Sequence, residues 1–351
     1  MRALITGACG FVGRYLVHEL VSSGYEVLAT DIIEPSPVVG STGKGEEFGI
    51  DTVDGGLVAW PPAFPEGVVF RRCDLLDFPA VRKLVTDWNP RFLFHLAAQS
   101  SAARSFDDPK ATLETNLFGT LSILEALKEE TESAGKGTKV LSVGSSEEYG
   151  IRSRQEMPLV EESPIEPVSP YAVSKTAQSL LSLQYHRTYG LDTIATRSFS
   201  HTGPGQADHF VLPSFAKQCA EIKGGFTEPL LNVGNLDVVR DFLDVRDVVR
   251  AYRLVIEKGK SGEVYNVCSG NGLELRGALD TLIRKVPAKI NVVKDPGLFR
   301  PADVPVMIGD SGKLRLDTGW EPRIRPEKML SDLIVYWEHE TARLFEGGSR
   351  L

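Results

Sequence analysis

The chain has 351 residues, of which 42% are hydrophobic and 25% charged, and this composition is ordinary for a globular protein that buries a core. Its length exceeds the usual size of a single core, so a large domain with a smaller lobe is expected. The formal net charge of −8 is a poor match to nucleic acid or to an anionic membrane surface, and no apolar run is long enough to predict a membrane span.

Strand-like and helix-like segments alternate through the first half of the chain. Residues 2–6 form a short apolar run, glycines follow at 7–13, and residues 14–23 place apolar side chains at helical spacing. This alternation predicts an α/β fold, a doubly wound parallel sheet of the Rossmann type with helices on both faces. Further strands are predicted at 25–30, 68–71, 91–95, 139–143 and 192–197, and helices at 77–88, 109–130 and 170–189.

Other stretches depart from this order. Residues 35–67 are rich in Gly and Pro and predict a long surface excursion, and residues 131–138 predict a polar turn. After residue 198 the alternation becomes irregular, which suits a smaller C-terminal substrate-binding lobe. We therefore expect a large domain over 1–197, with part of 236–265 returning to it, and a lobe built from 198–235 and 266–351.

The four cysteines are widely scattered and form no Cys-x-x-Cys pair, so neither a disulfide framework nor a zinc site is expected. The first residues run directly into a predicted strand, without the apolar segment of a signal peptide. Together these features predict a reduced, cytoplasmic protein. The cysteines are Cys9, Cys73, Cys219 and Cys268.

The glycines between the first strand and helix follow the pattern G-x-x-G-x-x-G, with Gly7, Gly10 and Gly13. Glycines at such positions permit a tight turn and let backbone N–H groups approach a pyrophosphate at a helix N-terminus. The strand before the motif and the helix after it are the context that this chemistry requires. The segment therefore predicts an NAD(P) site, to which Phe11 and Val12 also contribute.

Asp31 ends the second predicted strand and is placed to accept hydrogen bonds from an adenosine ribose. Its carboxylate would repel a 2′-phosphate and so favours NAD over NADP, while Arg14 offsets part of that repulsion. A turn or helix-capping role for Asp31 stays open. Asp74 and Leu75 follow a later strand and are placed to contact the adenine, although Asp74 equally suits the cap of the helix that begins near Asp77.

Three residues have the character of a proton-transfer site. Tyr171 and Lys175 lie one turn apart on one face of a predicted helix. A nearby ammonium is expected to lower the pKa of Tyr171, and Lys175 can also hold a nicotinamide ribose. Ser145 follows the 139–143 strand, whose carboxyl end faces the ligand crevice, so it is placed to bind a substrate carbonyl or hydroxyl. A Ser-rich turn is the simple alternative for Ser145 alone.

Several segments resemble the extended short-chain dehydrogenase/reductase family over nearly the whole chain outside 35–67. They are TGACGFVG (6–13), HLAAQSS (95–101), TNLFGT (115–120), VGSSEEYG (143–150), SPYAVSK (169–175), VRDFLDVRDVVRAY (239–252) and GEVYNVCSG (262–270). A finer resemblance is to the GDP-6-deoxy-D-mannose reductases, sisters of the GDP-mannose 4,6-dehydratases. It is carried by SFSHTGPGQ (198–206), FVLPSFAKQ (210–218), VGNLDVVRDF (233–242) and RPADVP (300–305).

The resemblance implies that NAD(P)H reduces the C4 ketone of a GDP-4-keto-6-deoxyhexose to a GDP-6-deoxyhexose of the GDP-rhamnose type. The family's catalytic residues fall on Ser145, which polarises the carbonyl, Tyr171, which supplies the proton, and Lys175. A homodimer is implied as well, formed by helices of the cofactor domain around a two-fold axis. Further implied cofactor contacts are Leu96, Ala97, Ala98, Asn116 and Ser198, and implied substrate contacts are Ser100, Ser146, His201, Lys217, Arg240, Arg300 and Asp303.

Glu147 keeps other activities open. In the dehydratases a glutamate two residues after the catalytic serine or threonine removes the proton next to the transient ketone, and Glu147 occupies that position. Residues 199–206 resemble the reductase version of their loop, and Glu148 replaces an apolar residue expected in the dehydratase, so a reductase is favoured. The alternatives are a GDP-mannose-type 4,6-dehydratase or a C4 epimerase with tightly bound NAD. A non-catalytic NAD(P)-sensing protein would not need the Ser145, Tyr171 and Lys175 set.

Overall fold

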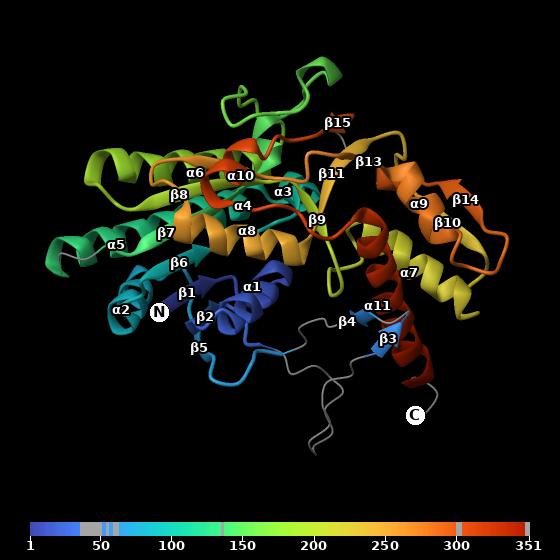
Figure 1. The fold of residues 1–351 in the computed structure, drawn as a ribbon, viewed down its shortest axis with the longest axis horizontal. Helices are drawn as coiled ribbons and strands as arrows, with labels where there is room; N and C mark the ends of the chain where they lie inside the picture. Colours follow the sequence, from blue (N-terminus) through green and yellow to red (C-terminus); the bar gives the residue numbers. More distant parts are fainter. Residues whose placement is uncertain (36–50, 54–55, 59–62, 135–136, 300–303, 348–351) are drawn as a thin grey trace.

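The computed structural model describes residues 1–35, 51–53, 56–58, 63–134, 137–299 and 304–347. Its largest element is a sheet of seven parallel strands with β1 near the middle, between β2 and β6 (Figure 1). The predicted doubly wound parallel sheet is confirmed. From one edge to the other the strands are β12 (Val264–Val267), β8 (Thr193–Ser198), β7 (Lys139–Ser145), β6 (Phe92–His95), β1 (Arg2–Thr6), β2 (Glu26–Asp31) and β5 (Val69–Arg72).

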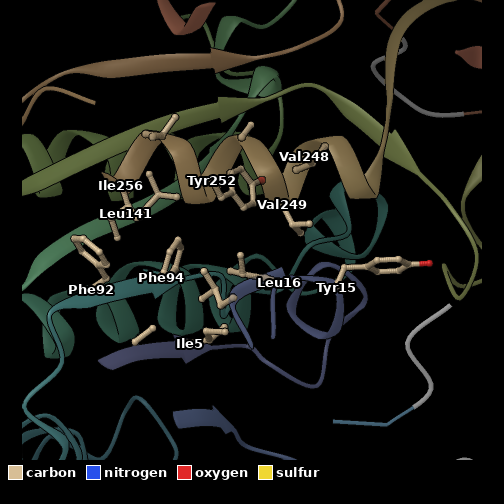
Figure 2. Packing of buried hydrophobic residues seen from close by; sticks show 14 of the residues in the cluster. Ile5, Tyr15, Leu16, Phe92, Phe94, Leu141, Val248, Val249, Tyr252 and Ile256 are labelled. Carbon is tan, nitrogen blue, oxygen red and sulfur yellow. The ribbon is translucent and has the colours of Figure 1, made fainter. Parts of the chain in front are cut away.

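Helices pack on both faces of this sheet because its strands are apolar on both sides. One face is covered by α1 (Phe11–Ser22) and α8 (Val245–Lys258), the other by α2 (Phe78–Trp88), α5 (Gly119–Ala134) and α6 (Pro170–Tyr189). Figure 2 shows buried side chains of the sheet, among them Ile5 and Phe94, facing those of α1 and α8. Each such side chain contributes about 1.5–3 kcal/mol when fully buried, so this packing fixes the strands and the loops at their carboxyl ends.

Residues 109–130 are helical, as predicted, but the helix is not regular throughout. The structure has α3 (Ala102–Asp107), then α4 (Pro109–Leu113), a π-helical turn η1 (Glu114–Phe118) and α5. Asp108 caps α4 and Pro109 begins it, while the π-helical turn interrupts the regular hydrogen-bond ladder before α5. The helix then continues to Ala134, so the predicted polar turn at 131–138 begins too early.

Within 35–67 the structure describes a short antiparallel pair, β3 (Asp51–Val53) and β4 (Gly56–Val58). The predicted surface excursion otherwise falls largely outside the described residues. Short 3₁₀ helices follow β7, namely η2 (Ser146–Tyr149) and η3 (Arg154–Glu156).

A second core forms the smaller lobe, at the opposite end of the molecule from α2 and α5 in Figure 1. β12 is an edge strand of the large sheet and α8 packs on that sheet, whereas β11 (Val239–Asp244) pairs with short strands outside it. No helix in the described part of the chain is both long and apolar enough to cross a membrane. The remaining elements are β9 (Ser200–Thr202), α7 (Val211–Lys223), β10 (Leu230–Val233), β13 (Gly272–Glu274), α9 (Leu275–Ile283), β14 (Asn291–Lys294), η4 (Pro296–Leu298), β15 (Val306–Met307), α10 (Gly312–Thr318) and α11 (Pro326–Gly347).

Candidate active site

A cavity of about 780 Å³ lies at the carboxyl ends of the parallel strands and is lined by residues of both the large domain and the lobe. Thr6, Asp31, Ser145 and Ser198 come from the ends of β1, β2, β7 and β8. Because the carboxyl ends of parallel strands meet at one edge of a doubly wound sheet, residues far apart in the sequence converge here. The cavity is therefore the candidate active site.

The glycine-rich turn between β1 and α1 forms one end of the cavity. Gly7 has φ +70°, and a Cβ atom there would lie 2.7 Å from the backbone nitrogen of Ala97. A Cβ atom on Gly13 would lie 2.2 Å from the Gly7 carbonyl oxygen. The three glycines, Phe11 and Val12 all line the cavity, so bare backbone and the start of α1 meet it. This cradle fits the pyrophosphate of a dinucleotide.

Asp31 lies at the cavity and also has the turn-stabilising role that the sequence left open. It lines the cavity, and its carboxylate accepts hydrogen bonds from the backbone nitrogens of Cys9 at 3.0 Å and Ile32 at 2.8 Å, so it also holds the turn together. Asp74 and Leu75 line the cavity as well. Asp77, rather than Asp74, caps α2, because its carboxylate accepts from the backbone nitrogen of Ala80 at 3.2 Å.

The other predicted cofactor contacts divide into two kinds. Leu96, Ala97, Ala98 and Ser198 line the cavity. Asn116 does not: its side chain is fully buried, accepts a hydrogen bond from the Gln99 backbone nitrogen at 2.7 Å and donates one to Ser174 Oγ at 2.8 Å. The hydrogen bonds of Asn116 therefore link the loop after β6 to α6.

Ser145, Tyr171 and Lys175 all line the cavity. Ser145 ends β7, and its Oγ accepts a hydrogen bond from the Glu147 backbone nitrogen at 3.2 Å. Tyr171 lies in the first turn of α6, and Lys175 follows one turn later. The Lys175 ammonium is buried and donates to the Val143 carbonyl oxygen at 2.8 Å and to a side-chain oxygen of Gln178 at 2.9 Å.

The electrostatics of this set differ from the sequence prediction. Burial raises the pKa of Tyr171 above its usual value, and the nearby Glu147 carboxylate raises it further, against a hydrogen bond with Ser145. Burial lowers the pKa of Lys175 to about 8, opposed by the charge of Glu148. The expected lowering of the Tyr171 pKa by Lys175 is therefore wrong, because desolvation dominates both groups. Tyr171 is a phenol at neutral pH.

The predicted substrate contacts fall in three groups. Ser100, Ser146, His201 and Arg240 line the cavity, as does Glu147. Lys217 is not among the lining residues and its ammonium pairs with an Asp208 carboxylate oxygen at 2.6 Å. Arg300 and Asp303 lie outside the described residues.

His201 has a defined tautomer. Its Nδ1 lies 2.9 Å from the carbonyl oxygen of Phe199 and therefore carries the proton when the ring is neutral, and burial lowers its pKa. Lobe residues that were not predicted also line the cavity, among them Gln206, His209 and Asn232. All three fall in or beside segments that carried the finer resemblance, which is the signal that could have identified them.

A profile of the GDP-mannose 4,6 dehydratase family matches residues 4–333. The chain belongs to this family. GDP-6-deoxy-D-mannose reductase of Pseudomonas aeruginosa is 38% identical over 267 residues, which cover 76% of this chain and 86% of that protein. GDP-mannose 4,6-dehydratase of Vibrio cholerae is 28% identical over 95% of this chain and 93% of its own length.

Solved structures agree with this family assignment. RMD from Pseudomonas aeruginosa in complex with NADPH has a TM-score of 0.79 and 33% identity, over 97% of this chain and 99% of that one. UDP-glucose 4-epimerase of Thermotoga maritima with UDP-glucose has a TM-score of 0.80 and 26% identity, over 97% and 100%. The resemblance to extended short-chain dehydrogenase/reductases, predicted from the motifs, is confirmed.

Proposed function

We propose that this family member is an NAD(P)H-dependent oxidoreductase that reduces the C4 ketone of a GDP-4-keto-6-deoxyhexose to the GDP-6-deoxyhexose. One observation carries the proposal: Ser145 and Tyr171 line the same cavity as the glycine cradle. Ketone reduction requires a proton donor beside a carbonyl-binding hydroxyl, and this pair supplies both. The similarity to the reductase of Pseudomonas aeruginosa supports the same substrate class.

Ser145, Tyr171 and Lys175 have different roles in the proposed reaction. Ser145 donates a hydrogen bond to the ketone oxygen and polarises the carbonyl, and Tyr171 delivers its phenolic proton to that oxygen as negative charge develops there. Burial keeps Tyr171 protonated until that step, since its ionised form is poorly solvated. Lys175 lies one helical turn after Tyr171 in α6, and its positive charge stabilises the Tyr171 phenolate left after proton transfer.

The glycine cradle, Asp31, Asp74 and Leu75 would hold the dinucleotide, with Leu96, Ala97, Ala98 and Ser198 beside it. When bound, the reduced nicotinamide supplies the hydride that the ketone carbon accepts. We expect Asp31 to favour NADH slightly, because a 2′-phosphate would lie near its carboxylate. The cofactor site lies at the start of α1, where backbone N–H groups and the helix dipole favour phosphate.

For the nucleotide sugar we propose contacts with Ser100, Ser146, His201 and Arg240, all of which line the cavity. A guanidinium such as that of Arg240 suits phosphate oxygens because it donates two parallel hydrogen bonds. Arg300 and Asp303 stay proposals from the sequence resemblance. Lys217 is a weaker candidate than the sequence suggested, since its ammonium is paired with Asp208.

Glu147 favours a second candidate activity, GDP-mannose-type 4,6-dehydration. It lines the cavity close enough to Tyr171 to raise the pKa of that phenol. A carboxylate in this position is suited to removing a proton from the carbon next to a ketone, which dehydration requires and simple reduction does not. The first step of dehydration needs Tyr171 as a base, however, and its raised pKa disfavours that form.

The direct test offers the purified protein GDP-4-keto-6-deoxymannose with NADH or NADPH and follows absorbance at the nicotinamide band. Cofactor oxidation is expected, and Tyr171→Phe should lower kcat by about 10²–10⁴-fold because the proton donor is lost. A parallel reaction contains GDP-mannose and NAD. Formation of a keto sugar there, without cofactor consumption in the first reaction, would replace the reductase proposal by the dehydratase.

We further propose a homodimer that acts in the cytoplasm. Val173 and Leu180 are exposed and lie seven residues apart, hence on one face of α6, and Phe118 of η1 is exposed as well. Exposed apolar residues on cofactor-domain helices are what a two-fold helix pairing would bury. Four buried free cysteines suit a reducing compartment. Leu180→Glu should convert the dimer to a monomer in sedimentation velocity.

A further inference from the structure

Glu148 is a carboxylate with no exposed surface, next to the catalytic serine loop but not part of the cavity lining. One of its oxygens accepts hydrogen bonds from the Ser145 backbone nitrogen at 2.9 Å and from Ser179 Oγ at 3.1 Å. The other accepts from Arg197 Nε at 3.1 Å. Burial raises the pKa of the Glu148 carboxyl, and the charge of Arg197 and the hydrogen bonds from Ser145 and Ser179 oppose that rise.

The partners of Glu148 lie on the elements that carry the proposed catalytic residues. Ser145 ends β7, and Ser179 lies on α6, one helical turn after Lys175. Arg197 lies on β8, next to Ser198. One side chain therefore joins the strand that presents Ser145 to the helix that presents Tyr171.

Arg197 is built into the same place. Arg197 is only 4% exposed. Its guanidinium donates hydrogen bonds to the Tyr149 hydroxyl at 3.1 Å and to the Glu161 carbonyl oxygen at 2.7 Å. The guanidinium carbon also lies 4.8 Å from the centre of the Tyr149 ring. The Glu148 carboxylate also packs tightly against Gly144, since a Cβ atom at Gly144 would lie 2.3 Å from a Glu148 carboxylate oxygen.

We infer that Glu148, held by Arg197, is a positioning residue that sets the distance between Ser145 and Tyr171. It does so through its hydrogen bonds to the Ser145 backbone and to Ser179 of α6. This inference rests on the proposed function, because it assigns Glu148 a role in that reaction. It also gives a reason for the acidic residue at a position where the dehydratase resemblance led us to expect an apolar one.

Two double variants test the inference. Glu148→Gln with Arg197→Met removes both charges but keeps an amide oxygen that accepts from Ser145 and Ser179, whereas Glu148→Leu with Arg197→Met removes the acceptor as well. Each removes both members of the Glu148–Arg197 ion pair, so both are designed to fold. Both also remove equally the Glu148 charge that opposes the lowering of the Lys175 pKa, so the comparison between the two variants isolates the hydrogen-bond acceptor. Arg253→Met is the control, because it breaks a partly buried ion pair with Glu19 that lies outside the cavity lining.

With the keto sugar and saturating cofactor, the Gln variant should keep kcat within about threefold of the wild type, while the Leu variant should lose roughly 100-fold. The KM for the keto sugar and the affinity for NADH should change less than about twofold in both, since no group that touches either ligand is altered. Arg253→Met should behave as the wild type. Equal kcat in the two double variants, with both folded by circular dichroism, would overturn the inference.

Ser179→Ala is the second variant, needed if the Leu variant does not fold. It leaves the ion pair intact and removes only the link from Glu148 to α6, so kcat should fall at least threefold while the loss of one buried hydrogen bond lowers the unfolding temperature by only a few degrees. An unchanged kcat would count against the inference. If the wild type itself reduces no keto sugar, the proposed function fails. Crystal structures then decide the positioning role, because only the Leu variant should show a longer separation between Ser145 Oγ and Tyr171 Oη.

Discussion

Replacing Lys175 by methionine should stabilise the protein while abolishing its activity. Burial lowers the pKa of Lys175 from 10.5 in the unfolded chain to about 8 in the folded one. At neutral pH that shift means that burial of the charged Lys175 ammonium destabilises the folded state by roughly 3 kcal/mol. Methionine avoids this cost but leaves the Val143 carbonyl and the Gln178 amide oxygen without their donor, at about 1 kcal/mol each. The expected net gain is on the order of 1 kcal/mol at pH 7.

The sign of the pH dependence follows from the same shift. Between pH 8 and 10.5 the unfolded chain binds more protons at Lys175 than the folded chain does, so this residue makes the wild type more stable as the pH rises. Urea unfolding of the wild type and Lys175→Met at pH 7 and pH 10.5 isolates the effect, since other groups titrate alike in both proteins. The advantage of the variant should disappear, or reverse, at the higher pH. A variant at least 1 kcal/mol less stable than the wild type at pH 7, with no relative change on going to pH 10.5, would refute the reasoning.

Other predictions concern turnover and cofactor binding. If the charged form of Lys175 is needed, kcat at pH 9 should be roughly a tenth of its plateau below pH 8, as measured in the reductase assay. Gly13→Ala would bring a Cβ atom to 2.2 Å from the Gly7 carbonyl oxygen, so NADH affinity measured by fluorescence should fall at least tenfold, and unchanged affinity would exclude the cradle as the pyrophosphate site. Asp31→Asn should raise kcat/KM for NADPH relative to NADH by about tenfold, and an unchanged ratio would show that Asp31 acts only through its backbone contacts to Cys9 and Ile32.

The parts of the site that sequence could predict are those with local signals. Strand runs and helical spacing predicted six of the seven strands of the large sheet, because fully buried parallel strands are continuous apolar segments. Ser145, Tyr171 and Lys175 were predicted because strand ends and helix turns place them by local rules, and all three line the cavity. The glycine pattern likewise predicted a close approach of backbone to ligand.

The parts that sequence could not predict depend on contacts between distant residues. The ion pair between Glu148 and Arg197 joins positions 49 residues apart, and no local sequence pattern predicts it. The hydrogen-bond partners of Asn116, Gln99 and Ser174, could not be predicted for the same reason, since they are known only once α6 is placed against the loop after β6. The direction of the Tyr171 pKa shift depends on the amount of solvent left around it, which spacing alone does not give.

The same electrostatic arrangement separates the two chemistries that the family performs. Burial raises the pKa of Tyr171 the most, and Glu147 and Glu148 raise it further, so the phenol begins as an acid. A reductase uses that acid directly, whereas a dehydratase or epimerase must first ionise it to take a proton from the sugar hydroxyl. Removing the Glu147 charge should therefore help the second chemistry by easing ionisation of Tyr171, yet it would also remove the base that dehydration needs later. A glutamate also stands at this position in the dehydratases, so the identity of Glu147 is neutral between the two chemistries, and the raised pKa of Tyr171 favours reduction.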